Sequence, residues 1–416
     1  MPSTRRQFLR SALGASTLVT LAPFAPPLLC RTALAAGSRR PGDDQTALVV
    51  IQLSGGNDGL NCVVPYADDT YARLRTTLRL TASEVHRIDD YLGFHPEMGQ
   101  CHRLFQDGLF GVVQGVGYPK SSREHPAAER DWQTARPADP RCPTGWVGRF
   151  ADHACDRQPG SAPAALVSDI SKPFGLTAER AVIPSIRSLR DTALAAGSHA
   201  AEHAEAVRLV AGATPGGGNP ALDLVRASAA AARDVSLRID AASRATPGAY
   251  PDTKLAARLR DVATLVRADA GFRIFYTDLG GDGFGGFDNH AFQKDHHASL
   301  LRQLSDAIAA FIDDLRRDGL ADRVALMTVS EFGRTVTENG RHGTNHGAAA
   351  PVFLAGGCLR GGLIGKHPDL ADLDNDAPRH HTDFRQVYAT MLDAWLRCDS
   401  ATVLGEPFAH VDIFRA

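Results

Sequence analysis

Five short runs of mostly apolar residues recur along the chain, and each ends in glycine or in polar residues. None of them alternates strictly between apolar and polar positions. Continuous apolar runs of this length are typical of strands buried on both faces, as in a parallel sheet covered by helices. We therefore predict five strands in an α/β fold. They span residues 47–53, 109–116, 272–279, 324–329 and 351–357.

Two further segments carry apolar residues at helical spacing. Between the third and fourth predicted strands, one face of the segment 300–315 is apolar. A helix in this position fits the crossover of a right-handed strand–helix–strand unit. A second helix is predicted at 383–396, where Val387, Met391 and Trp395 share one face.

The middle of the chain has a different composition. Residues 195–265 are rich in alanine and arginine and are interrupted by proline and glycine at 213–218. Such interruptions are typical of loops between periodic segments. We expect helices on either side of a flexible tip, which together form a helical cap inserted into the main domain.

The first 36 residues have the pattern of an export signal. They contain four arginines and no acidic residue, with Arg5 and Arg6 ahead of an apolar run at 11–30 and small residues at 33–36. This order predicts a cleaved twin-arginine signal, recognised by the twin-arginine translocase. The alternative is a membrane anchor, which three prolines in the run disfavour. We expect residues 37–416 to be the mature domain, periplasmic or secreted, with no membrane span.

Charge and cysteine content narrow the function classes. Loss of the signal removes four of 45 basic residues while 47 acidic residues remain, so the formal net charge falls from −2 to −6. An acidic chain without basic runs gives no reason to bind nucleic acid or an anionic membrane. Six cysteines remain in the mature chain, and Cys142 with Cys155 is the candidate disulfide that we would test first. No zinc-finger spacing is present, so structural zinc is not expected.

Polar, glycine-containing clusters follow four of the predicted strands. In α/β sheets, ligands bind where the carboxyl ends of the strands meet. Four clusters at equivalent positions therefore predict one ligand site at this edge. The clusters lie at 55–61, 118–125, 286–290 and 330–335, with a late addition at 343–347.

Three acidic residues of these clusters are candidate metal ligands, each with a simpler alternative. Asp58 follows a buried strand, although an aspartate beside glycine also caps turns. Asp288 and His290 point to the same side if the backbone is extended, and both could then contact one ion. Glu331 follows an apolar strand, so a buried carboxylate there needs a metal or a partner such as Arg334.

A histidine and several nucleophile candidates complete the set. His346 lies between glycines, which permit close approach of the backbone to a ligand. Ser121 and Ser122 stand before a predicted helix at 126–134, whose N-terminus favours anions. Serine is also a preferred helix N-cap, so a structural role is the alternative. A serine nucleophile would need a metal to lower the pKa of its hydroxyl, since no G-x-S-x-G motif is present.

These motifs resemble a family of exported, sulfatase-like bacterial proteins of unknown function in the alkaline phosphatase/sulfatase superfamily. The resemblance covers essentially the whole mature chain. It rests on GGNDGLN (55–61), FDNH (287–290), SEFGRT (330–335), GTNHG (343–347) and DFRQVYATMLDAWL (383–396). It implies a doubly wound, mostly parallel α/β sheet with helices on both faces.

The resemblance also implies site roles. Asp58 matches a metal-binding aspartate, while Asp288, His290 and His346 match one metal site. Glu331 stands where the superfamily has an Asp-His pair, and Ser122 stands near its nucleophile. Two departures are visible: the Asp288 and His290 pair is two residues apart instead of four, and no C-x-P-x-R sulfatase motif is present.

Together these observations predict an exported hydrolase of phosphate or sulfate esters, acting on a small molecule or a polysaccharide. One or two divalent ions (Zn, Mn, Ca or Mg) would polarise the ester. A non-catalytic envelope binding protein and a phosphotransferase or mutase on the same fold are the alternatives. The expected metal ligands are Asp58, Asp288, His290, Glu331 and His346, and the expected catalytic residues are Ser122, Arg123, His125 and Arg334.

Overall fold

The computed structural model describes residues 46–157, 163–189, 220–245, 248–281 and 286–415. The predicted export signal at 1–36 lies outside these ranges. Within them, every helix is either too short or too polar to cross a lipid bilayer.

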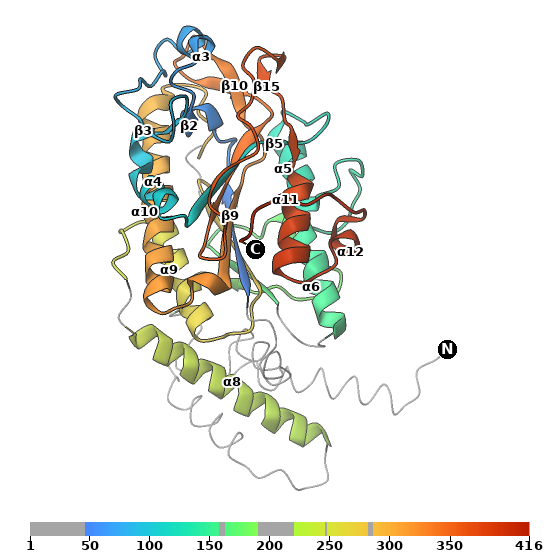
Figure 1. Ribbon diagram of the computed structural model, residues 1–416. Coiled ribbons are helices and arrows are strands. Elements are labelled where there is room, and N and C mark those ends of the chain that lie inside the picture. Colours follow the sequence, from blue (N-terminus) through green and yellow to red (C-terminus); the bar gives the residue numbers. More distant parts are fainter. Residues whose placement is uncertain (1–45, 158–162, 190–219, 246–247, 282–285, 416) are drawn as a thin grey trace.

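A nine-stranded sheet forms the centre of the described part of the chain (Figure 1). β1, β6, β7, β8 and β9 pair in parallel, and β12 runs antiparallel between β9 and β5. In spatial order the strands are β13 (Gly362–Ile364), β5 (Phe110–Gly117), β12 (Ala350–Ala355), β9 (Val324–Val329), β1 (Ala47–Leu53), β8 (Ile274–Leu279), β6 (Ala164–Val167) and β7 (Ser185–Ile186), while β16 (Thr382–Asp383) also pairs with β5.

Helices cover both faces of this sheet, as the side chains of β1 require. Val49 and Ile51 point into one core cluster, whereas Leu48 and Val50 point into another. The fold prediction, an α/β protein with a doubly wound, mostly parallel sheet, is therefore confirmed (Figure 1). The first cluster packs under α4 (Gly99–Gln106), α9 (Lys254–Arg267) and α10 (Gln293–Arg317), and the second under α5 (His125–Thr134), α6 (Trp146–Arg157), α11 (Phe384–Thr390) and α12 (Ser400–Leu404).

The local signals of the sequence explain where several elements begin and end. Each of the five predicted strands overlaps an observed strand, and the runs at 47–53 and 324–329 match β1 and β9 residue for residue. The predicted helix at 383–396 begins with a capping box made by Asp383 and Gln386. After α11 it continues as a π-helical turn at Met391–Trp395.

The predicted insertion at 195–265 is described only from residue 220 onwards. α8 (Pro220–Arg244) and α9 are its helices. α9 packs against α10 and β8, and its apolar side chains belong to the main core. α9 is thus part of the helical layer over the sheet, and the expected tip at 213–218 lies outside the described residues.

Small elements surround the carboxyl edge of the sheet. They include the hairpin formed by β10 (Arg334–Glu338) and β11 (Thr344–His346). The other elements there are α3 (Asp69–Leu74), the sheet of β2 (Val63–Val64), β3 (His86–Arg87) and β4 (Gly93–Phe94), the pair β14 (Leu373–Asp374) and β15 (Ala377–Pro378), and the 3₁₀ turns Gly59–Asn61, Pro96–Met98 and Phe174–Leu176. The turn Ala321–Arg323 directly precedes β9 at the opposite edge.

The described cysteines form no disulfide. Cys142 is buried and Cys155 is partly buried, and neither takes part in a disulfide. The Cys142 Sγ instead lies 3.4 Å from the carbonyl oxygen of Thr144. The proposed Cys142–Cys155 bridge is therefore not formed in this structure.

Candidate metal centre

The polar clusters meet because their strands run in the same direction. β1 is parallel to both β8 and β9, and β5 runs parallel to β9 because both are antiparallel to β12. Their carboxyl ends consequently lie at one edge of the sheet, where α/β proteins bind ligands.

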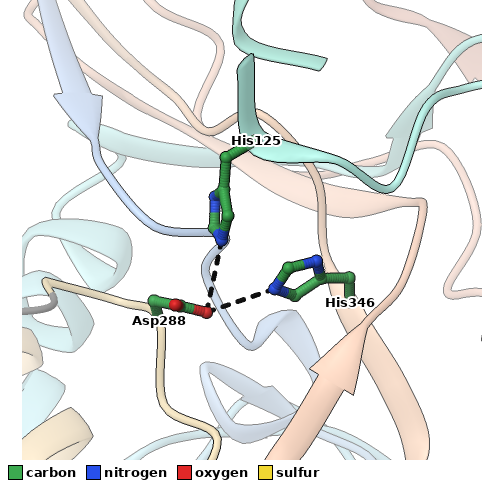
Figure 2. Close-up of side chains that lie close together, drawn as sticks. All are labelled: His125, Asp288 and His346. Atoms are coloured by element: carbon green, nitrogen blue, oxygen red, sulfur yellow. Dashed lines mark hydrogen bonds and ion pairs between the residues drawn. The ribbon is translucent and has the colours of Figure 1, made fainter. Parts of the chain in front are cut away.

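Three side chains from separate segments converge at this edge (Figure 2). His125 begins α5, Asp288 lies in the loop after β8, and His346 ends β11. Asp288 Oδ1 is 3.4 Å from His125 Nε2 and 3.3 Å from His346 Nε2. All three atoms lie within 4.8 Å of one another. Donors bonded to one zinc ion at about 2.0–2.1 Å also lie about 3–4 Å apart.

Glu331 fixes the orientation of His125. The carboxylate Oε1 of Glu331 lies 3.0 Å from His125 Nδ1 and also accepts the backbone N–H of Gly55 at 2.7 Å. A carboxylate only accepts, so Nδ1 carries the proton and Nε2 of the neutral ring keeps a lone pair. That Nε2 is buried and has no hydrogen-bond partner. A carboxylate–histidine pair with a bare second nitrogen is the usual outer support of a metal ligand.

His346 is oriented in the same way by the backbone. Its Nδ1 donates to the carbonyl oxygen of Arg123 at 2.6 Å. A carbonyl cannot donate, so Nε2 is again the nitrogen with the lone pair in the neutral ring. Two imidazoles on different elements thus present bare nitrogens toward the same carboxylate oxygen of Asp288.

His290 adjoins this group. Its Nε2 lies 3.0 Å from Asp288 Oδ1 and 2.8 Å from His346 Nε2. Two imidazole nitrogens at this distance share a proton or both face a cation. Burial lowers the pKa of His290 despite the opposing charge of Asp288, which favours the neutral, ligating form of its ring.

Arg334 holds Asp288 in place rather than an external anion. Its guanidinium is buried and donates to the carbonyl oxygens of Gly56 at 2.7 Å and Phe287 at 3.0 Å. It also donates to Asp288 Oδ1 at 2.6 Å. Burial alone would raise the pKa of Asp288, but Arg334 outweighs it and holds that pKa below its ordinary value. The carboxyl is thus an anion, as a metal ligand must be.

Asp58 has a different partner from the one its position suggested. It is buried and forms a two-pronged ion pair with Arg75, at 2.5 Å and 2.8 Å. The amide of Gln293 also donates to it. Burial tends to raise the pKa of Asp58, yet the charge and hydrogen bonds of Arg75 keep it below its ordinary value. Its two oxygens are therefore occupied by protein donors.

Arg123 was predicted to bind an anion and Ser122 to act as the nucleophile, and both side chains have partners outside the donor group. The Arg123 guanidinium donates to the carbonyl oxygens of Asp374 and Asn375, and only its backbone carbonyl touches the donor group through His346. The Ser122 hydroxyl accepts the backbone N–H of Glu124 at 3.1 Å, just before α5. The structure thus brings together His125, Asp288, His290, His346, Glu331 and Arg334, and it gives Asp58 and the side chain of Arg123 other partners.

Sequence reasoning placed His125 in the catalytic set and missed its pairing with Glu331. A histidine at the first position of a helix that follows a parallel strand was the available signal. Its partner lies 206 residues further along the chain, so only the fold reveals the pair. Arg75 carried no signal at all, since it lies in a loop after a short helix.

Comparison with known proteins places the chain in a family. Residues 116–412 match a family model described as a protein of unknown function, DUF1501. No curated protein matches the sequence.

Solved structures show only distant likeness. A lipoteichoic acid synthase from Listeria monocytogenes has 8% identity and a TM-score of 0.32, covering 77% of this chain and 68% of its own. An integral membrane lipooligosaccharide phosphoethanolamine transferase from Neisseria meningitidis has 11% sequence identity and a TM-score of 0.39. This match covers 86% of this chain and 56% of the transferase. A phosphonate monoester hydrolase from Silicibacter pomeroyi has 11% sequence identity and a TM-score of 0.31. This match covers 87% of this chain and 77% of the hydrolase. Scores this low carry no weight in assigning the site.

Proposed function

The chain belongs to the DUF1501 family, whose function is unknown, and we propose that it is a metal-dependent hydrolase of phosphate or sulfate esters. The proposal rests on the donor group of His125, Asp288 and His346, to which we add His290. Two or three imidazoles and one carboxylate suit zinc or another transition metal better than calcium or magnesium.

One observation carries the metal assignment. His125 Nε2 is a buried nitrogen without a hydrogen-bond partner, 3.4 Å from Asp288 Oδ1, and its ring is held by Glu331 on the other side. Leaving a buried polar atom unpaired costs about 1–3 kcal/mol, so proteins rarely retain one without a ligand for it. A cation between this nitrogen, Asp288 and His346 would satisfy all three.

The chain's own residues then have separate tasks. A divalent ion held here would polarise an ester oxygen and lower the pKa of a bound water. Arg334 keeps Asp288 charged and fixed, and Glu331 keeps His125 turned toward the group. Ser122 and water are the two candidate nucleophiles, and the variant Ser122→Ala distinguishes them, because only a serine nucleophile would be lost.

The first experiment measures metal content. Protein purified without added metal should contain about one equivalent of a transition metal by elemental analysis, and the variant Asp288→Ala should contain almost none. The same pair should then differ in hydrolysis of p-nitrophenyl phosphate and p-nitrophenyl sulfate. Asp90→Ala, an exposed aspartate in the turn between β3 and β4, is the matched control. Full metal content and full activity in Asp288→Ala would rule the proposal out.

A specific observation also supports a non-catalytic binding protein. The side chains of Arg123 and Arg334 are both engaged by carbonyl oxygens, so neither is free to bind a phosphate or sulfate group. Such a protein would hold the metal but hydrolyse neither ester. The two readouts of the first experiment therefore separate the two functions.

We further propose that residues 1–36 direct export through the twin-arginine translocase. The sequence support is the Arg5 and Arg6 pair ahead of an apolar run. Replacing both by lysine should retain the protein in the cytoplasm at its full length, whereas the wild-type protein should be found outside the cytoplasm as a shortened chain. N-terminal sequencing of the exported protein measures this directly, and equal export of both would exclude the route.

A further inference from the structure

A cleft of about 540 Å³ lies beside the donor group and follows one face of α5. His125 and Glu331 line one end of it, and Glu129 lines the wall further along the helix. Asp169 and Ser171 after β6 and the glycines 280–281 after β8 line other parts. The cleft therefore joins the donor group to the carboxyl ends of three neighbouring strands.

Glu129 is one helical turn from His125. Residues four apart on a helix have Cβ atoms about 5–6 Å from each other and lie on the same face. If an ester is held at the donor group, the alcohol part that leaves in hydrolysis extends into this cleft. A substituent of that alcohol which follows this face of α5 would then approach Glu129, because His125 and Glu129 line the same cleft.

The partners of Glu129 are all neutral. Its Oε1 accepts from the side-chain amides of Gln52 at 2.9 Å and Gln133 at 2.7 Å. Each of the other two carboxylates that line the cleft contacts either an arginine or a histidine of the donor group. Glu331 is engaged by His125, and Asp169 contacts the guanidinium of Arg258. Among the described carboxylates that line the cleft, Glu129 is thus the one whose hydrogen-bond partners are neither an arginine nor a residue of the donor group.

We propose that Glu129 determines specificity by selecting esters whose leaving alcohol carries a protonated amine. This inference rests on the proposed function, since it assigns the substrate class of the same site. An ammonium group would supply the positive charge that the amides of Gln52 and Gln133 lack, and ionised pairs form stronger hydrogen bonds than neutral ones. A leaving alcohol with a second anion would instead meet the like charge of this carboxylate.

A structural role of Glu129 makes a different prediction. Its amide partners also tie α5 to neighbouring elements, because Gln133 Oε1 accepts the backbone N–H of Gly175 at 3.1 Å. If Glu129 served only to brace these elements, its replacement would change the turnover of all esters alike. A specificity role changes only the esters that carry the amine.

The test compares esters that differ by one charge. The metal-loaded mature protein is assayed with the phosphate and sulfate esters of ethanolamine and of n-propanol, which are similar in size. The wild-type protein should have a kcat/KM about tenfold or more higher for the amine-bearing ester, chiefly through KM. In Glu129→Gln the ratio of the two kcat/KM values should fall to about one.

Glu124→Gln is the matched control, because it removes an exposed charge at the start of the same helix without lining the cleft. It should keep the amine preference. An equal loss on both esters in Glu129→Gln would overturn the inference. Absence of any preference in the wild-type protein would overturn it too, whether or not the variant folds.

A binding measurement separates this inference from the proposed function. If the wild-type protein hydrolyses none of the esters, the hydrolase proposal fails. Calorimetric titration of O-phosphoethanolamine and n-propyl phosphate into the metal-loaded protein then decides the inference. Tighter binding of the amine by about tenfold, lost in Glu129→Gln, supports it. Equal binding of the two compounds contradicts it.

Discussion

The histidines of the donor group are set by what their Nδ1 atoms touch. His125 is held by a carboxylate and His346 by a backbone carbonyl, and each therefore turns its Nε2 toward Asp288. The nitrogen that each ring offers to a metal ion is thus set by groups outside the donor group itself. Removing such an outer partner commonly lowers the metal affinity of a site by about 10- to 100-fold.

Glu331→Gln tests this support. We expect the variant to remain folded and to bind the metal about 10- to 100-fold more weakly, because an amide no longer fixes the proton on His125 Nδ1. Calorimetric titration of the apo protein with Zn²⁺ measures the change. Glu124→Gln, whose carboxylate is exposed, should bind as the wild type does. Unchanged affinity in Glu331→Gln would remove Glu331 from the site.

The pH dependence of metal binding follows from His125. The hydrogen bond to Glu331 raises the pKa of His125 above its ordinary value of about 6.5, against the opposing effect of burial. A proton on Nε2 competes with the metal. Affinity should therefore rise with pH through that raised pKa and level off above it, and it should fall steadily on acidification. An affinity that is flat between pH 6 and pH 8 would contradict this ligand assignment.

Asp58 illustrates the opposite outcome for a candidate ligand. Asp58→Asn leaves the buried Arg75 without its counter-charge, and such a loss costs about 3–5 kcal/mol of folding free energy. We expect the metal content to stay at the wild-type level, since the donor group does not include this carboxyl. Urea unfolding in the presence of a chelator measures the loss of folding free energy, and elemental analysis measures the metal content. Loss of metal at unchanged stability would return Asp58 to the ligand set.

At the scale of elements, the site is assembled by docking the β10–β11 hairpin onto the loop after β8. Thr344 donates its backbone N–H to the Asn289 carbonyl at 3.1 Å, and the Asn339 side chain donates to the His290 carbonyl, also at 3.1 Å. Gly343 permits this contact, because a Cβ there would lie 2.5 Å from the Asn289 oxygen. The hairpin carries His346 and the loop carries Asp288.

Gly343→Ala should therefore separate the two halves of the site. We expect weaker metal binding and a lower melting temperature, because the added methyl group meets backbone atoms that cannot move without shifting the loop. Gly340→Ala in the same hairpin is the control, since a Cβ there has no atom within 4 Å. Scanning calorimetry and zinc titration compare the two. If both variants behave alike, the close contact at Gly343 has no role in assembling the site.

At the scale of the whole molecule, the donor group links the beginning of α5, the loop after β8 and the end of β11. A ligand that binds only the folded state stabilises it by about 2.7 kcal/mol at a concentration of 100 times its Kd. Added Zn²⁺ should therefore raise the melting temperature of the chelator-treated protein, and Asp288→Ala should abolish the rise. Thermal unfolding with and without metal measures this. An equal shift in both proteins would place the stabilising ion elsewhere.

Local patterns were enough to predict the fold class and the edge of the sheet at which the donor group of His125, Asp288 and His346 lies. Apolar runs marked β1 and β9 to the residue, because a strand buried on both faces is apolar at nearly every position; Gln52 and Thr328 are the polar residues of these two strands. Shorter strands such as β6, with four residues, gave no comparable signal. The polar clusters after the strands pointed to one edge, because parallel strands end on the same side.

The pairing of side chains within that edge was decided only by the tertiary structure. Glu331 is hydrogen-bonded to His125, Arg334 to Asp288 and Arg75 to Asp58. From the sequence, Glu331 and Asp58 were predicted to bind the metal directly, and Arg334 was predicted to be catalytic. Hydrophobic periodicity is a property of neighbouring residues, so the sequence determines it. Contacts between loops depend on the order of strands in the sheet, and that order follows from packing the whole chain into one core.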